Sequence, residues 1–476
     1  MAASIDRRTL LRGAGLAAGV GMTGLGLASC AGAGTNQPGG GGESVAIDTG
    51  NTENPFSMAA DQPGEIAIPD QGWGTQWLED QIAAFNKVHP DVEVTWTGHK
   101  DMSVTIQPRF IQGNPPDLVM PVGVQMTTLV DQGQVSNLNE FYDAPTVDGE
   151  GTVADALLPG TLEAADFLGD GNRLIGPYTF TTYGLWYQAT VFEENGWTYP
   201  TTWDEMLTLC EEIKSTGLAP WAYTGKYPGY IFTPMQNMAA KASGIDWILS
   251  VDNLEPNAWR DDNFRLAAEA IAELRGKGMF LKGTEGLSHT ESQTLWAQGE
   301  AAFIPCGGWL ENESEAAIDP ASRIRMAPTP SLTSSDTMPF ETLAAYPGNQ
   351  VFVPSAAKNK AFGMEFLRFM WSKECSAIWT ENTKSFTSLA GYYDGLSDVP
   401  SGLESQIEAI QNAGSNILPP TKYGSFYPDF GKAVTDKTGL LASGEITPAQ
   451  YIDQVQAEAD KVAKDPNVKK FTRELS

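Results

Sequence analysis

Trp309 is the side chain with the clearest chemical role in this sequence. Gly307 and Gly308 permit a close turn before it, and Glu311 and Asn312 follow it as hydrogen-bonding groups. Aromatic faces pack against patches of C–H groups, whereas carboxylates and amides bind hydroxyl groups. The combination predicts a binding site for a ligand that has both apolar patches and hydrogen-bonding groups. Packing of the indole in a core is the alternative.

Further candidate side chains stand in loops or near predicted strand ends. Trp73 lies between two glycines, directly after the first predicted strand, and Tyr227 and Tyr230 flank a Pro-Gly pair in a loop rather than on a helical stripe. The remaining candidates are Asp117, which follows a Pro-Pro turn, and Tyr178 and Thr182, which share one predicted strand. For each of them the alternative is a structural role: packing for the aromatic residues and Thr182, and capping of a helix or bracing of a strand end for Asp117.

The sequence contains no motif of a familiar catalytic or nucleotide-binding centre. There is no GxSxG nucleophile elbow, no HExxH zinc motif and no GxxxxGK[ST] phosphate loop. The glycines around Trp73 do not complete a dinucleotide fingerprint, because Trp77 occupies the position of the third glycine. We therefore expect a binding protein and not an enzyme, with no cofactor. A glycosidase stays as the alternative, because a pair of carboxylates could be drawn from 59 acidic residues.

The N-terminus has the pattern of an export signal. Arg7 and Arg8 precede a short apolar stretch from Gly13 to Leu27, and small residues lead to Cys30. We predict that residues 1–29 are a twin-arginine lipoprotein signal, with Sec export as the alternative because Asp6 replaces the usual Ser or Thr. Acylation of Cys30 would hold the protein in the lipid bilayer at the extracellular face of the cell membrane. An ordinary cysteine near a cleavage site is the alternative.

Composition limits the remaining chain to a few classes. Residues 30–64 are rich in Gly, Asn, Thr and Pro, so we predict a flexible tether there. The residues beyond them are too many for one ordinary core, and two lobes are expected. The net charge of −29 argues against binding to nucleic acid, which needs clustered Lys and Arg.

The cysteine and histidine residues predict no metal or redox centre. Cys210, Cys306 and Cys375 lack CxxC spacing, and none of the three histidines has another His or Cys at ligand spacing. One disulfide with one free thiol, or three buried thiols, are both compatible with these positions.

Hydrophobic patterns predict an α/β organisation. Strands are expected at 65–69, 91–96 and 117–120, with helices at 75–87 and 103–112 between them. Alternation of this kind indicates a largely parallel sheet, whose ligands bind beyond the carboxyl ends of the strands. Later segments favour helices, namely 202–213, 264–274, 361–371 and 448–464.

Several segments in a fixed order resemble solute-binding proteins of carbohydrate ABC importers. Gly113–Asp117 is similar to the GxPPD segment of that family, and Pro200–Glu205 is similar to its PxTWDE helix start. The likeness runs from Ile66 to Asn467. Within the family, the strings Asn253–Trp259 and Trp309–Glu313 resemble actinobacterial lipoproteins that bind N-acetylglucosamine or diacetylchitobiose. The sequence departs from that subgroup at Trp73, where Phe is expected, and at Cys306, where Asn is expected.

The resemblance implies a two-lobed α/β fold of the periplasmic-binding-protein type, with an interlobe cleft and a hinge of about three crossings. We expect those crossings at 178–183, 303–309 and 346–354. The N-terminal lobe would comprise 65–177 and 309–346, and the C-terminal lobe 183–303 and 354–470. All nine candidate residues named above would then contact the sugar.

The resemblance also implies the function and the partners. The protein would be the receptor of an ABC importer that captures N-acetylglucosamine, chitobiose or a related chito-oligosaccharide and delivers it to membrane permease subunits. We expect it to act as a monomer. A receptor for another neutral oligosaccharide is the alternative within the family.

Overall fold

The computed structural model describes residues 46–70, 72–167, 171–396 and 399–474. The predicted signal, Cys30 and the first part of the predicted tether lie outside these residues. Within the described ranges, no helix has both the length and the apolar content needed to cross a membrane.

The first sheet is small and parallel. β1 (Gly64–Pro69) is its central strand, with β2 (Val94–His99) on one side and β3 (Leu118–Val119) on the other. α1 (Gln76–Val88) connects β1 to β2 and buries Trp77, Leu78 and Phe85 against the sheet. The predicted strands, the first helix and the parallel pairing are therefore confirmed.

The helix predicted at 103–112 is wrong in one respect, because it is broken. The chain forms α2 (Met102–Thr105) and α3 (Gln107–Ile111), separated at Ile106. Pro108 explains the break, since proline lacks an amide proton and its ring would clash with the carbonyl four residues earlier. The other short helices near this sheet are α4 (Met126–Asp131), α5 (Asn139–Asp143), η1 (Ala154–Ala156) and α6 (Thr161–Ala165).

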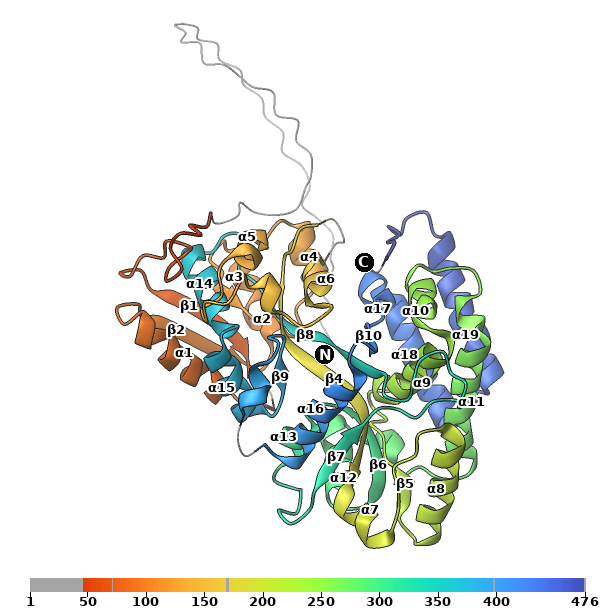
Figure 1. Cartoon of the computed structure of the whole chain (residues 1–476). Helices are drawn as coiled ribbons and strands as arrows, with labels where there is room; N and C mark the ends of the chain where they lie inside the picture. The colour runs from red at the N-terminus through yellow and green to blue at the C-terminus, as the bar shows by residue number, and fades with distance from the viewer. Residues whose placement is uncertain (1–45, 71, 168–170, 397–398, 475–476) are drawn as a thin grey trace, which may run out of the picture. The chain divides into compact units, whose positions relative to one another are not determined.

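The second sheet is larger and mixed. Its long strand β4 (Gly176–Gln188) pairs antiparallel with β8 (Leu343–Val351) and β6 (Ala301–Gly307), and Figure 1 shows β4 and β8 running side by side. The three predicted crossings fall on these three strands. The remaining strands of this sheet are β5 (Ala219–Trp221), β7 (Ile324–Ala327), β9 (Phe386–Thr387) and β10 (Ile417–Leu418).

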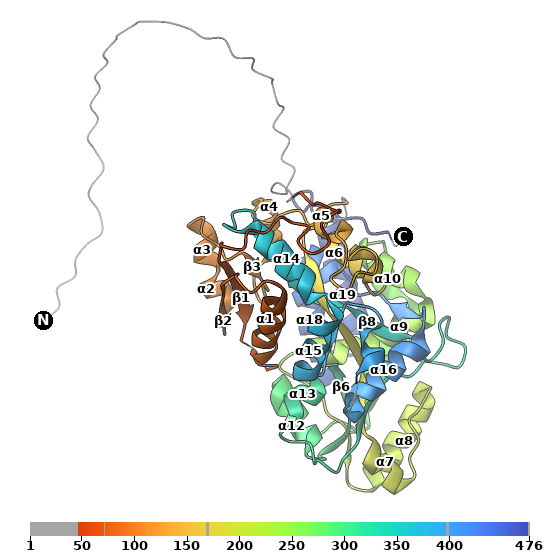
Figure 2. The same ribbon diagram turned by 60° about the vertical axis from the view of Figure 1, so that its left-hand side comes forward.

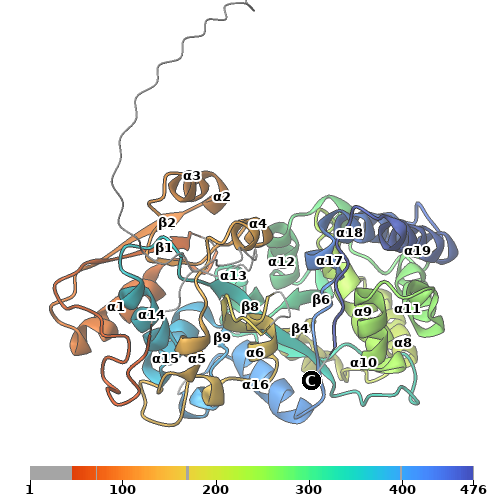
Figure 3. The same ribbon diagram turned by 90° about the horizontal axis from the view of Figure 1, so that it is seen from above.

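Helices cover the second sheet and bury a large aromatic core. α8 (Trp203–Ser215) and α19 (Pro448–Lys464) begin at Thr202 and Thr447, each in a capping box, as their sequences predict. Figure 3 shows α18 and α19 beside α9 and α11. The other helices of this region are α7 (Ala189–Asn195), α9 (Gly229–Ser243), α10 (Ile245–Asp252), η2 (Ala258–Arg260), α11 (Asp262–Gly276), η3 (Thr284–Gly286), α12 (His289–Ala297), α13 (Leu310–Ser314), η4 (Tyr392–Gly395), α16 (Ser401–Ala413), α17 (Tyr423–Phe426) and α18 (Pro428–Ser443).

Two helices late in the sequence pack on the first sheet rather than on the second. α14 (Lys360–Met370) and α15 (Lys373–Thr383) lie beside α1, as Figure 2 shows. Phe85 meets Phe369 with ring centroids 5.1 Å apart, and Trp77 meets Trp379 at 4.7 Å. We expected all of residues 354–470 to lie in one lobe with residues 183–303, whereas α14 and α15 pack against α1 of the first sheet. The lobe boundaries as a whole stay a prediction.

The end of the predicted tether is part of the folded core. Phe56 and Met58 are 2% and 5% exposed and pack in the same cluster as Trp77 and Phe85. The side chain of Asn54 binds the backbone of Met58 through both its oxygen and its nitrogen. The prediction of a flexible tether is therefore wrong for residues 46–64, because two apolar side chains anchor this segment.

Candidate functional site

An aromatic cavity of about 380 Å³ opens beside the middle of β4 and the carboxyl end of β6, and we call it the first hollow. It is lined by Tyr183 from β4, Cys306 and Gly307 from β6, and Trp309 directly after β6. The opposite wall comes from the loop before α9, from the first turns of α9 and from α18. Those lining residues are Lys226, Tyr227, Pro228, Gly229, Tyr230, Thr233, Thr435 and Asp436.

The rings of the first hollow hold one another in place. Tyr183 meets the edge of Trp309 at 5.6 Å between centroids, and Tyr230 meets Trp309 edge-on at 6.2 Å. Burial raises the pKa of Tyr183 to about 12, so its hydroxyl group is neutral and able to donate at physiological pH. The hollow therefore offers ring faces together with neutral hydroxyl groups.

Gly307 and Gly308 are required by two different close contacts. A Cβ atom on Gly307 would lie 2.2 Å from the ring of Trp309, so the indole rests over this glycine. A Cβ atom on Gly308 would lie 2.2 Å from the side-chain oxygen of Gln406. Gly307 leaves room for the Trp309 ring, which lines the hollow. Gly308 leaves room for the side chain of Gln406.

A second, larger cavity of about 630 Å³ adjoins the first, and we call it the second hollow. Thr233 lines both hollows, and Tyr183 of the first stacks on Tyr346 of the second at 4.7 Å and an interplanar angle of 19°. The other residues that line the second hollow are Thr127, Asp131, Ala164, Phe167, Phe232, Gln236, Pro347, Gln350, Pro420, Thr421, Lys422, Tyr423, Ser425, Phe426, Pro428, Lys469 and Phe471.

Three of the predicted site residues come together in the first hollow. Tyr227, which is 52% exposed, stands at its rim, and Tyr230 and Trp309 are partly buried in its wall. All three residues therefore line the same cavity. Direct sugar contact by each of them stays a prediction.

Two predicted polar residues next to this site form hydrogen bonds with helix α16 instead. Glu311 accepts hydrogen bonds from the amides of Gly402 at 2.9 Å and Leu403 at 2.8 Å, the first turn of α16. Thr182 is fully buried, and its hydroxyl donates to the side-chain oxygen of Gln406 at 2.7 Å. We call Thr182, Glu311 and Gln406 the α16 clamp, because they fasten this helix to β4 and to α13.

Four other predicted residues lie outside both hollows. Tyr178 is fully buried in the core and its hydroxyl accepts a hydrogen bond from Gln81 at 2.7 Å. Asp117 accepts from the backbone amides of Glu65 and Asn359, so it braces β1 as the structural alternative proposed. Asn312 donates to the carbonyl of Asn382 at 3.2 Å, and the half-buried Trp73 packs on Trp379 at 6.1 Å.

The structure adds Tyr183, Thr233 and Tyr346 to the candidate site. Tyr183 and Tyr346 are end residues of predicted crossings, so their positions in the sequence carried a signal. The positions of Tyr183 and Tyr346 in the sequence do not indicate that their rings stack on each other. Thr233 lies in the first turns of α9, and only the fold shows that it faces both hollows.

The described part of the chain has neither a cluster of metal ligands nor a reactive thiol. No group of three or more His, Cys, Asp or Glu residues there could hold a metal ion. Cys210, Cys306 and Cys375 are buried free thiols, which selects the second of the two alternatives for the cysteines. Burial raises the pKa of Cys306 well above its ordinary value, so this thiol at the hollow is not a reactive thiolate.

Solved structures share the fold. A structure titled SBP RafE in complex with raffinose aligns with a TM-score of 0.64 at 17% identity, covering 84% of this chain and 99% of that one. A chitin oligosaccharide binding protein aligns with a TM-score of 0.63 at 18% identity, covering 81% and 94%. Both proteins have the two-domain solute-binding fold, so the predicted α/β fold class is confirmed.

Sequence comparison extends the likeness to almost the whole chain. The Diacetylchitobiose binding protein NgcE of Streptomyces coelicolor is 30% identical over 476 residues, which cover 98% of each chain. The family of binding proteins described as bacterial extracellular solute-binding protein matches residues 71–374. The glycosidase alternative is therefore not carried further, and the resemblance noted in the sequence is confirmed. The chain belongs to the bacterial extracellular solute-binding protein family.

Proposed function

We propose that this protein is the sugar receptor of an ABC importer and that it captures N-acetylglucosamine or chitobiose for a membrane permease. The observation that carries this proposal is the ring cluster of the first hollow, in which Tyr183, Tyr230 and Trp309 frame an open cavity. The similarity to a protein named for diacetylchitobiose binding supports the choice of sugar.

Recognition would follow from the chemistry of a neutral sugar. Ring faces of Trp309 and Tyr230 would cover the C–H patches of a pyranose, and the hydroxyl groups of Tyr183 and Thr233 would exchange hydrogen bonds with its hydroxyl groups. An acetamido group would add a methyl for an apolar niche, with one donor and one acceptor. Such sites bind through convergent polar groups on an apolar wall.

Delivery would use closure of the cleft. A sugar held in the first hollow gains contacts when the parts of the protein around it approach each other, which shifts an open–closed equilibrium. The closed form would then be the form that the permease recognises. Small-angle scattering tests this step, and we expect the radius of gyration to fall when the sugar is added. An unchanged radius at saturating sugar would argue against closure.

The location of the protein is part of the same proposal. Export through the twin-arginine route and acylation of Cys30 would place a monomeric receptor on the outer face of the cell membrane. Mass spectrometry of the mature N-terminus tests the anchor, and Cys30→Ser should release the protein into the medium. Replacement of Arg7 and Arg8 by Lys tests the export route.

A thermal-shift screen of mono- and oligosaccharides tests the ligand. A sugar present at 100 times its Kd should add about 2.7 kcal/mol of stability. We expect a response to chitobiose and none to cellobiose, which has the same linkage without acetamido groups. A response only to sugars such as raffinose would overturn the choice of sugar and favour a receptor for another neutral oligosaccharide, a candidate that the raffinose-bound structural neighbour supports.

A further inference from the structure

The second hollow lies directly beside the first. Thr233 lines both cavities, and the stacked rings of Tyr183 and Tyr346 form a floor that passes from one to the other. The exposed half of β8 supports this floor, since residues 346–350 are all partly accessible whereas residues 342–345 are buried. A linear ligand that fills the first hollow can therefore extend into the second.

The second hollow offers the same kinds of group as the first. Phe426 and Phe471 stack at 4.7 Å with an interplanar angle of 11°, and both rings are partly exposed at the wall. Gln236 and Gln350 add planar amides, and Gln236 already accepts from the Thr421 hydroxyl at 3.1 Å. Partly exposed aromatic rings with neighbouring amides suit further pyranose units.

The charged side chains at the second hollow are balanced. The ammonium of Lys422 lies 3.5 Å from the carboxylate of Glu163 on α6. Lys469 lies over the ring of Phe471 at 5.0 Å, and Asp131 provides an acidic group on the other wall. This balance favours a neutral ligand over a phosphorylated or carboxylated one, because neither sign of charge dominates.

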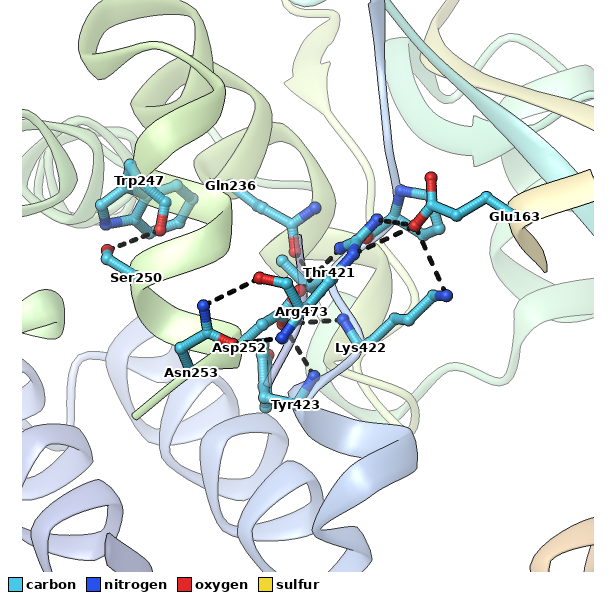
Figure 4. A network of polar contacts seen from close by, with 11 residues as sticks. Glu163, Gln236, Trp247, Ser250, Asp252, Asn253, Thr421, Lys422, Tyr423 and Arg473 are labelled. Atoms are coloured by element: carbon cyan, nitrogen blue, oxygen red, sulfur yellow. Dashed lines mark hydrogen bonds and ion pairs between the residues drawn. The ribbon is translucent and has the colours of Figure 1, made fainter. Parts of the chain in front are cut away.

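A buried polar network fixes the two chain segments that carry the Phe426–Phe471 stack (Figure 4). The fully buried Asp252 accepts from the backbone amides of Lys422 at 2.7 Å and Tyr423 at 2.8 Å, and pairs with the guanidinium of Arg473 at 2.6 Å. Asn253 exchanges two hydrogen bonds with the backbone of Arg473. The segment at 420–426 and the segment at 469–473 are thereby held against α10.

The same network reaches the opposite wall. Arg473 donates to Glu163 from its Nε at 3.2 Å and its Nη2 at 3.1 Å, and Figure 4 shows Lys422 directed at the same carboxylate. The wall that holds Phe471 is thus fixed by contacts within the protein itself. Preformed sites of this kind lose less freedom on binding than mobile loops.

We propose that the second hollow is an additional sugar subsite, so that the protein binds oligosaccharides of three or more units running from Trp309 to Phe471. This inference rests on the proposed sugar-receptor function. Small-molecule sites commonly measure roughly 300–1,000 Å³. The first hollow, at about 380 Å³, lies at the small end of that range, and the second adds about 630 Å³.

Calorimetric titration with N-acetylglucosamine oligomers of increasing length tests the subsite. We expect the wild-type affinity to rise about tenfold between the dimer and the tetramer. Phe471→Ala should abolish this gain and leave the affinity for the dimer unchanged. Gln350→Ala is a second, less disruptive variant and should reduce the gain in part. Phe280→Ala is the matched control, because Phe280 is a partly buried phenylalanine that lines neither hollow.

The outcomes separate this inference from the proposed function. A wild type that binds the dimer but gains nothing with longer oligomers overturns the second subsite and leaves the sugar receptor intact. Equal weakening of dimer and tetramer by Phe471→Ala also overturns it, because the residue would then act on the fold. A wild type that binds no oligomer of this series overturns the proposed ligand itself.

Discussion

The first hollow and the α16 clamp use neighbouring residues of the same segments for opposite purposes. Trp309 and Tyr183 face an open cavity, whereas Glu311 and Thr182, only one or two positions away, are consumed by contacts with α16. Chemical type alone would assign all four to a ligand. The difference shows that polar side chains at a chain crossing are needed first to hold the crossing together.

The two regions also differ in whether their side chains already have partners within the protein. Each polar group of the clamp has a protein partner: Glu311 binds two amides, and Gln406 joins Thr182 to the carbonyl of Gly308. Unpaired groups in a buried place would be costly, so such contacts favour one arrangement. The rings of the first hollow pack on other aromatic rings, and Tyr183, Tyr230 and Trp309 are all partly exposed in its wall. Mutations should therefore separate stability from affinity.

The largest expected effect is a loss of stability on removal of the clamp carboxylate. Glu311→Ala leaves the amides of Gly402 and Leu403 without an acceptor in a buried place. We expect the free energy of unfolding to fall by about 2–4 kcal/mol, measured by urea denaturation. The affinity of the protein that remains folded should be unchanged. Glu311→Gln, which keeps one acceptor oxygen, should lose less.

Removal of the indole from the first hollow should have the reverse signature. Trp309→Ala should weaken sugar binding by about 2 kcal/mol, or roughly 30-fold, in a calorimetric titration. Trp309→Phe retains a ring face and should recover part of this loss. If Trp309→Ala binds the sugar as tightly as the wild type, Trp309 does not contact the ligand, and the proposed difference between the first hollow and the α16 clamp is wrong.

Gly307 and Gly308 are adjacent but contact different regions, the first hollow and the α16 clamp. Gly307→Ala places a Cβ atom against the Trp309 ring, whereas Gly308→Ala places one against the Gln406 side chain. We expect the first to lower affinity about tenfold with little loss of stability, and the second to cost about 1–3 kcal/mol of stability. Calorimetric titration and urea denaturation give an affinity and a free energy of unfolding for each variant. The same pattern in both variants would contradict the separate roles.

Local signals in the sequence were enough for much of the fold. The first strand, α1, and the capped starts of α8 and α19 depend on residues within one or two turns, and each of them is observed. The glycines before Trp309 likewise located a ring at the end of a strand. These features need no knowledge of distant segments.

The role of individual polar residues could not be predicted in the same way. Glu311 binds amides that lie 91 and 92 residues further along the chain, and Thr182 binds a side chain 224 residues away. No local pattern reveals such partners. The break between α2 and α3 is different, since Pro108 stands in the sequence and its effect on a continuous helix could have been weighed.

The smallest effect that we predict is a pH dependence confined to the clamp. Burial raises the pKa of Glu311 above its ordinary value of 4.5, although the two amide hydrogen bonds act in the opposite direction. The folded protein therefore binds a proton here more readily than the unfolded chain does. The stability that follows from this difference is fully present below the unfolded pKa and is lost as the pH rises through the folded pKa.

Urea denaturation between about pH 4 and pH 7 measures this dependence when the wild type is compared with Glu311→Gln. We expect the free energy of unfolding of the wild type to decline relative to that of the variant as the pH rises, because glutamine cannot titrate. All other titrating groups are common to both proteins and cancel in the difference. A difference that grows in favour of the wild type would mean that the hydrogen bonds from Gly402 and Leu403 outweigh burial. The two amide hydrogen bonds would then stabilise the ionised form of Glu311 by more than burial destabilises it.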